Sequence, residues 1–145
     1  MIIGLDVHGV IDTDPKFFAK LTKSLQFNGH LVHILTGVEH GPRLNKELVR
    51  LNVHFDALFS VTSYLKDQKI KIIKYDNDDE ARPIFDNEIW DMAKAIYCCR
   101  EKIDLHIDDS VNYGKYFHSL HTQYLIYNNA IREFLMHLTK GDTHA

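Results

Sequence analysis

The chain has 145 residues, of which 45% are hydrophobic and 26% charged, and its formal net charge is −3. This length fits one domain with one core, so we expect a single domain over residues 1–145. The weakly negative charge gives no strong signal for nucleic-acid binding. No apolar run approaches the ~20 residues that a membrane span needs, so we expect no membrane association.

The two cysteines, Cys98 and Cys99, are adjacent in the sequence. A disulfide between neighbours closes no useful loop, so we expect two reduced thiols in a reducing compartment. The N-terminal run MIIGLDVHGV lacks a basic segment and reaches Asp6 after a few small or apolar residues, which is unlike a secretory signal peptide. The expected location is the cytoplasm.

Short apolar runs alternate with amphipathic stretches, and this alternation gives the expected elements. Asp14-Pro15 is typical of a helix start, and Asn28-Gly29 of a helix end. In chain order, we expect strands at 2–5, 30–35, 57–61, 103–107 and 122–127, and helices at 15–27, at 42–51, from about 87 and from about 131. This order predicts an α/β fold with three layers, in which a mainly parallel sheet carries helices on both faces.

The segment 62–86 has no clear pattern. It contains one strand candidate, Ile70 to Tyr75, and an acidic run, Asp76 to Glu80, which we expect to be a solvated loop. The segment is too short for a full cap domain but long enough for a flap or a small insert.

Polar side chains follow three of the predicted strands. Asp6 ends the first strand, Thr36-Gly37 the second, and Asp108-Asp109 the strand at 103–107. Ligands of parallel sheets bind outside the carboxyl ends of the strands, so we expect these groups to share one cleft. Clustered carboxylates repel one another unless a cation lies among them, and their hard oxygens suit Mg²⁺. The Thr36 hydroxyl and the Thr36-Gly37 amides can donate hydrogen bonds to a phosphate.

These segments resemble motifs of the haloacid-dehalogenase (HAD)-like superfamily. The first motif of that family, an apolar strand ending in Asp-x-Asp-Gly, is similar to the run IIGLDVHGVID. Its second and fourth motifs resemble HILTG and LHIDDS, and the order and spacing fit over roughly residues 1–127. The resemblance implies a Rossmann-like HAD fold and a small phosphatase without a cap.

The resemblance also implies a catalytic role for each matching acid. Asp6 would be the nucleophile that forms an aspartyl-phosphate. Mg²⁺ would be held by Asp6, by the backbone carbonyl of His8 and by an acid of the Asp108-Asp109 pair. The sequence leaves open which acid of that pair binds the metal and which caps a helix expected near Asn112.

Phosphate binding would fall to Thr36, Gly37 and a lysine upstream of the fourth motif. Lys94, in the run WDMAKAIYCCR, is the candidate, and it would also restrain Asp6. Lys94 lies off the helical stripe that we expect to face the core, which consists of Ile89, Met92, Ala93 and Ile96.

His8 departs from the family pattern, because phosphatases of the family usually carry aspartate at this position. That aspartate acts as general acid toward the leaving oxygen and then as base toward water. An imidazole titrates near ~6.5 and can do both jobs at neutral pH. The sequence therefore gives two hypotheses: a Mg²⁺-dependent phosphohydrolase acting on a phosphorylated small molecule or nucleotide, or a catalytically impaired phosphate-binding module.

Overall fold

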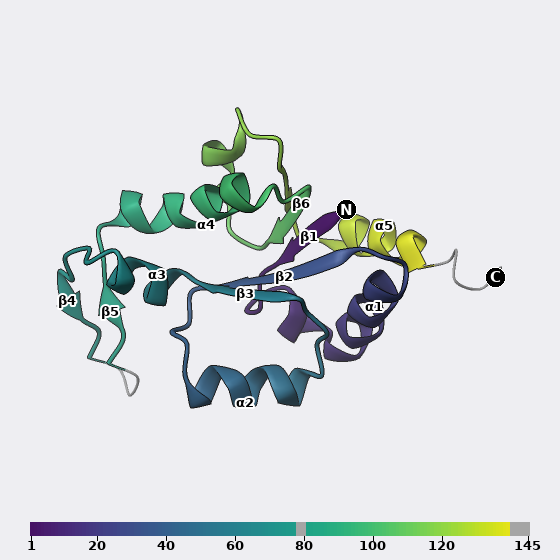
Figure 1. The fold of residues 1–145 in the computed structure, drawn as a ribbon, viewed down its shortest axis with the longest axis horizontal. Helices are drawn as coiled ribbons and strands as arrows, with labels where there is room; N and C mark the ends of the chain where they lie inside the picture. Colours follow the sequence, from purple (N-terminus) through teal and green to yellow (C-terminus); the bar gives the residue numbers. More distant parts are fainter. Residues whose placement is uncertain (78–80, 140–145) are drawn as a thin grey trace.

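The computed structural model describes residues 1–77 and 81–139 of the chain. Figure 1 shows a central sheet with helices on its two sides. The strands are β1 (Ile2–Leu5), β2 (Leu31–Thr36), β3 (Ala57–Ser60), β4 (Lys74–Tyr75), β5 (Pro83–Ile84), β6 (Leu105–Asp108) and β7 (Gln123–Ile126). The helices are α1 (Pro15–Phe27), α2 (Pro42–Leu51), α3 (Val61–Asp67), α4 (Asn87–Glu101) and α5 (Asn129–Thr139), with 3₁₀ turns at Ile11–Thr13 and Gly114–Phe117. None of the helices in these two ranges has the length and apolar character needed to cross a membrane.

Five strands form one parallel sheet in the order β3-β2-β1-β6-β7. The central strand β1 pairs with β2 on one side and with β6 on the other, and Leu5 lies opposite both Ile34 and Ile107. The chain therefore moves outward from β1 in one direction and later returns to its other side. The carboxyl end of β1 is the point in such a sheet where a crevice opens for a ligand. The predicted α/β fold with a parallel sheet is confirmed.

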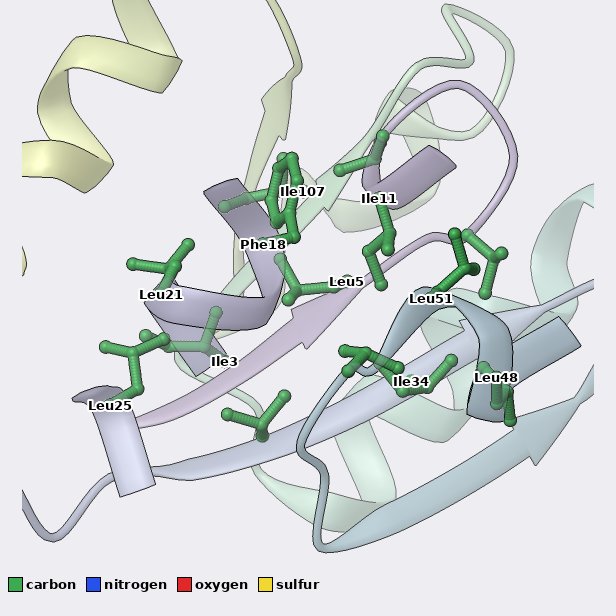
Figure 2. Close-up of a cluster of buried hydrophobic side chains, with 14 of the residues drawn as sticks. Ile3, Leu5, Ile11, Phe18, Leu21, Leu25, Ile34, Leu48, Leu51 and Ile107 are labelled. Atoms are coloured by element: carbon green, nitrogen blue, oxygen red, sulfur yellow. The ribbon is translucent and has the colours of Figure 1, made fainter. Parts of the chain in front are cut away.

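The helices α1, α2 and α5 cover one face of the sheet, and the core between them is mainly apolar, with Thr22 of α1 as a buried polar side chain. Figure 2 shows Phe18, Leu21 and Leu25 of α1 close to Ile3 and Leu5 of β1. All five side chains are at most 1% exposed. Burying each one stabilises the fold by roughly 1.5–3 kcal/mol before conformational entropy is subtracted.

The helices α3 and α4 cover the opposite face, and this second core contains polar groups among its apolar ones. On this face, the Nδ1 of His33 lies 2.8 Å from the hydroxyl of Tyr97. Lys94 of α4 and His106 of β6 are also buried on it. A buried polar group is costly unless it has a partner, so these side chains need the specific contacts described below.

The helix α3 was not predicted, because its first residues, Val61 and Thr62, are β-branched and continue the apolar run of β3. The helix begins where the Ser60 side chain accepts a hydrogen bond of 3.0 Å from the backbone N–H of Ser63. This N-cap is a local signal that the β-branched pair masks.

The strand expected over Ile70 to Tyr75 is wrong in extent. Only Lys74–Tyr75 is a strand, and it forms an antiparallel hairpin with Pro83–Ile84. The ladder stays short because Pro83 has no N–H to donate. The hairpin and α3 fill the segment 62–86, while the acidic run Asp76 to Glu80 lies partly outside the described residues.

The predicted core stripe of α4 is also wrong. Ile89, Met92 and Ile96 are 36–43% exposed, and of the four predicted positions only Ala93 is buried. The buried side of α4 consists of small and polar residues: Ala93, Lys94, Ala95, Tyr97 and Cys98. Small residues of α4 pack in the second core beside Leu35 and Phe59, so the apolar periodicity of Met92 and Ile96 marks the outward side instead.

The helix expected near Asn112 does not form, and a 3₁₀ turn over Gly114–Phe117 takes its place. Asp108 does accept a backbone hydrogen bond there, but from Ser110 within the loop, at 3.1 Å. Such a contact is a local turn, which asparagine and aspartate often form at strand ends.

Candidate active site

Two aspartates lie side by side because β1 and β6 are parallel neighbours. The backbone N–H of Asp6 donates a hydrogen bond of 3.0 Å to the carbonyl of Ile107, so Asp6 follows β1 at the level where Asp108 ends β6. Asp6 is 7% exposed and Asp108 is fully buried. Two buried carboxylates in such proximity require positive charge.

Lys94 supplies that charge from α4. Its ammonium lies 3.1 Å from Oδ1 of Asp6 and 2.7 Å from Oδ2 of Asp108, and the lysine is 4% exposed. The Nζ atom also lies over the ring of Tyr113, 5.3 Å from its centroid. Lys94 therefore contacts both carboxylates, whereas the resemblance implied a restraint on Asp6 alone.

The two carboxyls of this cluster respond in opposite ways to their surroundings. Burial raises the pKa of Asp6 to about 7, with a further contribution from Asp108 that Lys94 only partly offsets. Burial alone would raise the pKa of Asp108 as well, but the hydrogen bond from His106 and the ammonium of Lys94 together lower it. Burial disfavours the charge of Lys94, yet the two aspartates raise its pKa above the ordinary value. Asp108 and Lys94 thus form an ion pair that stays charged on both partners at neutral pH. Asp6 is the group of the three that gains or loses a proton near neutrality.

His106 supports Asp108 from beneath the site and was missed by the sequence analysis. Its Nε2 lies 3.0 Å from Oδ2 of Asp108, and because that carboxylate can only accept, Nε2 carries the proton. The imidazole is fully buried, and this burial lowers its pKa, so the ring is neutral. Gly4 lies opposite on β1, where an added Cβ would come within 2.9 Å of Nδ1 of His106. The signal available in the sequence was the spacing, because His106 lies two residues before Asp108 and alternate side chains of a strand share a face.

Asp109 completes a group of three carboxylates. One carboxylate oxygen from each of Asp6, Asp108 and Asp109 lies within 4.8 Å of the others, and Asp109 is exposed. Its carboxylate lies against Gly9, where an added Cβ would be 2.0 Å from Oδ2. Gly9 also has a φ of +88°, which other residues rarely adopt, so this position needs glycine for both reasons.

His8 lies at the mouth of the site. Its Nε2 is 3.0 Å from Oε1 of Glu47 on α2, and its side chain is 51% exposed. Glu47 was not among the predicted site residues, because a glutamate in an amphipathic helix resembles any solvated surface charge. Through this pair, α2 contributes to orienting the His8 side chain.

The structure separates the predicted pair Thr36 and Gly37. Gly37 lines the cleft, with the Trp90 ring so close that an added Cβ would lie 2.9 Å from it. Thr36 is fully buried and does not line the cleft, and its Oγ1 accepts a hydrogen bond of 3.2 Å from the N–H of Val38. The expectation that Thr36 opens onto the cleft is therefore wrong, because its side chain turns inward to hold the loop after β2.

One cleft of about 630 Å³ connects these groups. The predicted site residues that line it are Asp6, His8, Gly37, Lys94, Asp108 and Asp109. The hairpin, α3 and the start of α2 contribute its other walls, including Pro42 and Thr62. This volume lies within the ordinary range of small-molecule sites, ~300–1,000 Å³, so a small organic ligand fits in the cleft.

Comparisons with known proteins bear on the fold. Neither protein-family models nor curated proteins match the chain. A crystal structure of an uncharacterized protein from Corynebacterium glutamicum is similar, with a TM-score of 0.60 at 16% sequence identity. The match covers 95% of this chain and 93% of that chain. At this identity the likeness shows the fold alone: a three-layer, Rossmann-like α/β arrangement across almost the whole length.

Proposed function

We propose that this protein is a Mg²⁺-dependent phosphohydrolase of the HAD-like type, which transfers a phosphoryl group to Asp6. The observation that carries the proposal is the convergence of three carboxylates within 4.8 Å, with the Lys94 ammonium in contact with two of them. A structural ion pair needs only one acid for each base. An exposed third acid beside a buried pair, at the carboxyl edge of a parallel sheet, favours a ligand-binding site.

The donor set fits Mg²⁺ better than a softer metal. All three side chains offer carboxylate oxygen, and the described residues place no histidine or cysteine in the group. Asp6, Asp109 and the backbone carbonyl of His8 would hold the ion. Asp108 already accepts bonds from Lys94, His106 and Ser110, so we assign it mainly to holding Lys94. When bound, Mg²⁺ supplies charge neutralisation for the phosphate oxygens.

The chemistry assigned to the chain's own residues has two stages. A carboxylate oxygen of Asp6 attacks phosphorus, the ester P–O bond breaks, and His8 donates a proton to the leaving oxygen. His8 then takes a proton from water, whose oxygen attacks phosphorus and releases Asp6 and inorganic phosphate. Lys94 stabilises charge on the transferred group and keeps Asp6 oriented. We assign the neighbouring phosphate contact to the backbone N–H of Gly37, with Thr36 supporting that loop.

The test of this proposal is hydrolysis of p-nitrophenyl phosphate with Mg²⁺ and with EDTA. We expect Mg²⁺-dependent turnover that Asp6→Asn lowers at least about 10³-fold, since an amide cannot act as the nucleophile. Asp67→Asn, an exposed aspartate outside the cleft, is the matched control. Turnover that persists in Asp6→Asn would rule out an aspartyl-phosphate.

The second candidate is a phosphate-binding module without efficient turnover, and His8 is the observation that favours it. Substrates with poor leaving groups separate the two. If His8 is the general acid, His8→Ala should lower the hydrolysis of an alkyl phosphate about 10²-fold or more, and that of p-nitrophenyl phosphate less. His8→Asp should raise alkyl phosphate turnover. Equal alkyl phosphate rates for His8→Ala and the parent would show that the His8 side chain is a bystander, whereas a parent that hydrolyses neither phosphate would favour the binding module.

We also propose a cytoplasmic location. Both cysteines are free, and Cys98 is buried beside the site. Burial raises the pKa of the Cys98 thiol to about 12, so this group stays protonated and unreactive. A thiol kept in this state suits a reducing compartment.

A further inference from the structure

The cleft has a second wall whose charge is opposite to that of the carboxylate cluster. Three cationic side chains line it: Arg43 in the first turn of α2, Lys66 in the last turn of α3, and Arg82 beside β5. Figure 1 shows that α3 and the hairpin lie beyond the edge at which the strands of the sheet end. The phosphoryl-transfer groups lie at that edge, so the cations line the part of the cleft away from the sheet.

Two of these cations, Lys66 and Arg82, form ion pairs that are exposed to solvent. Lys66 lies 2.7 Å from Oε1 of Glu39, and this hydrogen bond raises the pKa of Lys66, which is therefore charged at neutral pH. Arg82 lies 3.5 Å from Asp76, both of them well exposed, and Asp76 does not line the cleft. Exposed pairs of this kind contribute little to stability, so a ligand anion can compete for both cations.

We propose that the substrate carries a second anionic group, apart from the phosphoryl group that reacts, and that Lys66 and Arg82 bind it. This inference rests on the proposed function, because it takes the carboxylate cluster as the phosphoryl site. The volume of about 630 Å³ has room for an organic spacer between the two groups. The substrate class is a phosphate monoester with a phosphate or a carboxylate at its other end.

Glu39 gives the outer wall a feature that can be tested. It lines the cleft and neutralises Lys66 in the free protein, so a bound anion must replace it as the partner of Lys66. Removing the charge of Lys66 and removing the charge of Glu39 should therefore change the affinity for a second anionic group in opposite directions. If the pair had only a structural role, both changes would lower the affinity.

The probes are phosphonates, whose C–P bonds resist hydrolysis, so binding is measured without turnover. Isothermal titration calorimetry with Mg²⁺ compares butane-1,4-diphosphonate with butylphosphonate, which has one anionic group. We expect the diphosphonate to bind about tenfold more tightly. A third probe, 5-phosphonopentanoate, distinguishes the two sources of the second charge: a preference for it over the diphosphonate assigns the outer wall to a carboxylate, and the reverse to a phosphate.

The variants test the assignment to this wall. Lys66→Gln should lower the preference for the diphosphonate about threefold to tenfold, and Glu39→Gln should raise it by a similar factor. Arg82→Gln should act like Lys66→Gln. Lys71→Gln, an exposed lysine on the segment after α3 that does not line the cleft, is the matched control and should leave the preference unchanged.

The outcomes separate this inference from the proposed function. If the chain hydrolyses p-nitrophenyl phosphate but binds the mono- and diphosphonate equally, the inference fails and the phosphohydrolase stands. If the diphosphonate is preferred and the Lys66 and Glu39 variants shift that preference in opposite directions, the outer wall is supported even without hydrolysis. Losses of affinity in both variants would overturn the inference, because they would indicate a structural pair.

Discussion

The two faces of the sheet are built by different means. The face under α1, α2 and α5 buries mainly apolar side chains, with Thr22 as a buried polar exception on α1, and Figure 2 shows part of this core around Phe18 and Leu21. The face under α4 holds a chain of polar contacts that runs from His106 through Asp108 and Lys94 to Asp6. Apolar burial is favourable by itself, whereas buried charges are stable only as a complete set. The apolar face therefore contributes mainly stability, whereas the polar face combines an apolar core with buried charged groups that cost stability.

The largest expected effect comes from removing Lys94, the cation at the centre of the polar face. Lys94→Met leaves Asp6 and Asp108 buried without their cation, so we expect a loss of about 3–5 kcal/mol in the free energy of unfolding without Mg²⁺. Any Mg²⁺-dependent phosphatase activity should fall at least about 10²-fold, because the Lys94 ammonium would no longer stabilise the negative charge on the phosphoryl group. Urea denaturation in EDTA and rates with p-nitrophenyl phosphate measure the two effects.

Leu21→Ala is the matched change on the apolar face. It should cost about 3 kcal/mol through cavity formation, because Leu21 is 1% exposed. Activity for each folded molecule should nevertheless stay close to that of the parent. If Leu21→Ala lowered kcat as much as Lys94→Met does, the division between a stabilising face and a reactive face would be wrong.

The same contrast explains what the sequence could predict about the fold. The helix α1 was predicted with its bounds because Leu21 and Leu25 recur at helical spacing and face an apolar sheet. The buried side of α4 was not, because Lys94 occupies a core position and the outward Met92 and Ile96 carry the apolar periodicity. Hydrophobic patterns reveal only elements whose partners are hydrophobic.

The site was predicted to the extent that it depends on strand ends. Asp6 and Asp108 end adjacent parallel strands, so topology alone brings them together. Glu47 was missed because it reaches His8 only once α2 has packed. His106 lies two residues before Asp108, and it was missed because the alternation of side chains along the strand was not applied to it. Thr36 was placed at the correct strand end, but the direction of its side chain depends on the loop that follows, which periodicity does not describe.

The next smaller expected effect is the pH dependence of stability that Asp6 alone contributes to the polar face. Between the ordinary value of 3.8 and the raised pKa of about 7, the folded protein keeps a proton on Asp6 that the unfolded chain has released. Without metal, the free energy of unfolding of the parent should therefore fall relative to that of Asp6→Asn as pH rises through this window. Across this pH window, the free energy of unfolding of the parent should fall by on the order of 2 kcal/mol relative to that of Asp6→Asn. The fall is smaller than the full pKa shift would give, because Asp6 titrates together with Lys94 and Asp108.

Urea denaturation of both proteins in EDTA at several pH values from 4 to 8 measures this difference. The pKa values of His33 and His106 are lowered by burial, so these groups favour the folded state as pH rises. They are present in both proteins, and the comparison removes most of their contribution. A stability difference that does not change with pH would show that Asp6 is ionised throughout and that burial does not govern it.

The smallest expected effect compares the two acids that end β6. If Mg²⁺ binds the folded state as proposed, it should raise the melting temperature of the parent by about 3–6 °C when well above its Kd. Asp109 is exposed and Asp108 is buried with bonds to Lys94, His106 and Ser110. Asp109→Asn should therefore remove most of the Mg²⁺ shift and hardly change the melting temperature in EDTA, while Asp108→Asn should lower the latter directly. Glu133→Gln, an exposed change on α5, should keep the full shift. A full Mg²⁺ shift in Asp109→Asn would indicate that Asp108, and not Asp109, binds the metal. Asp108 would then contact both the ion and Lys94.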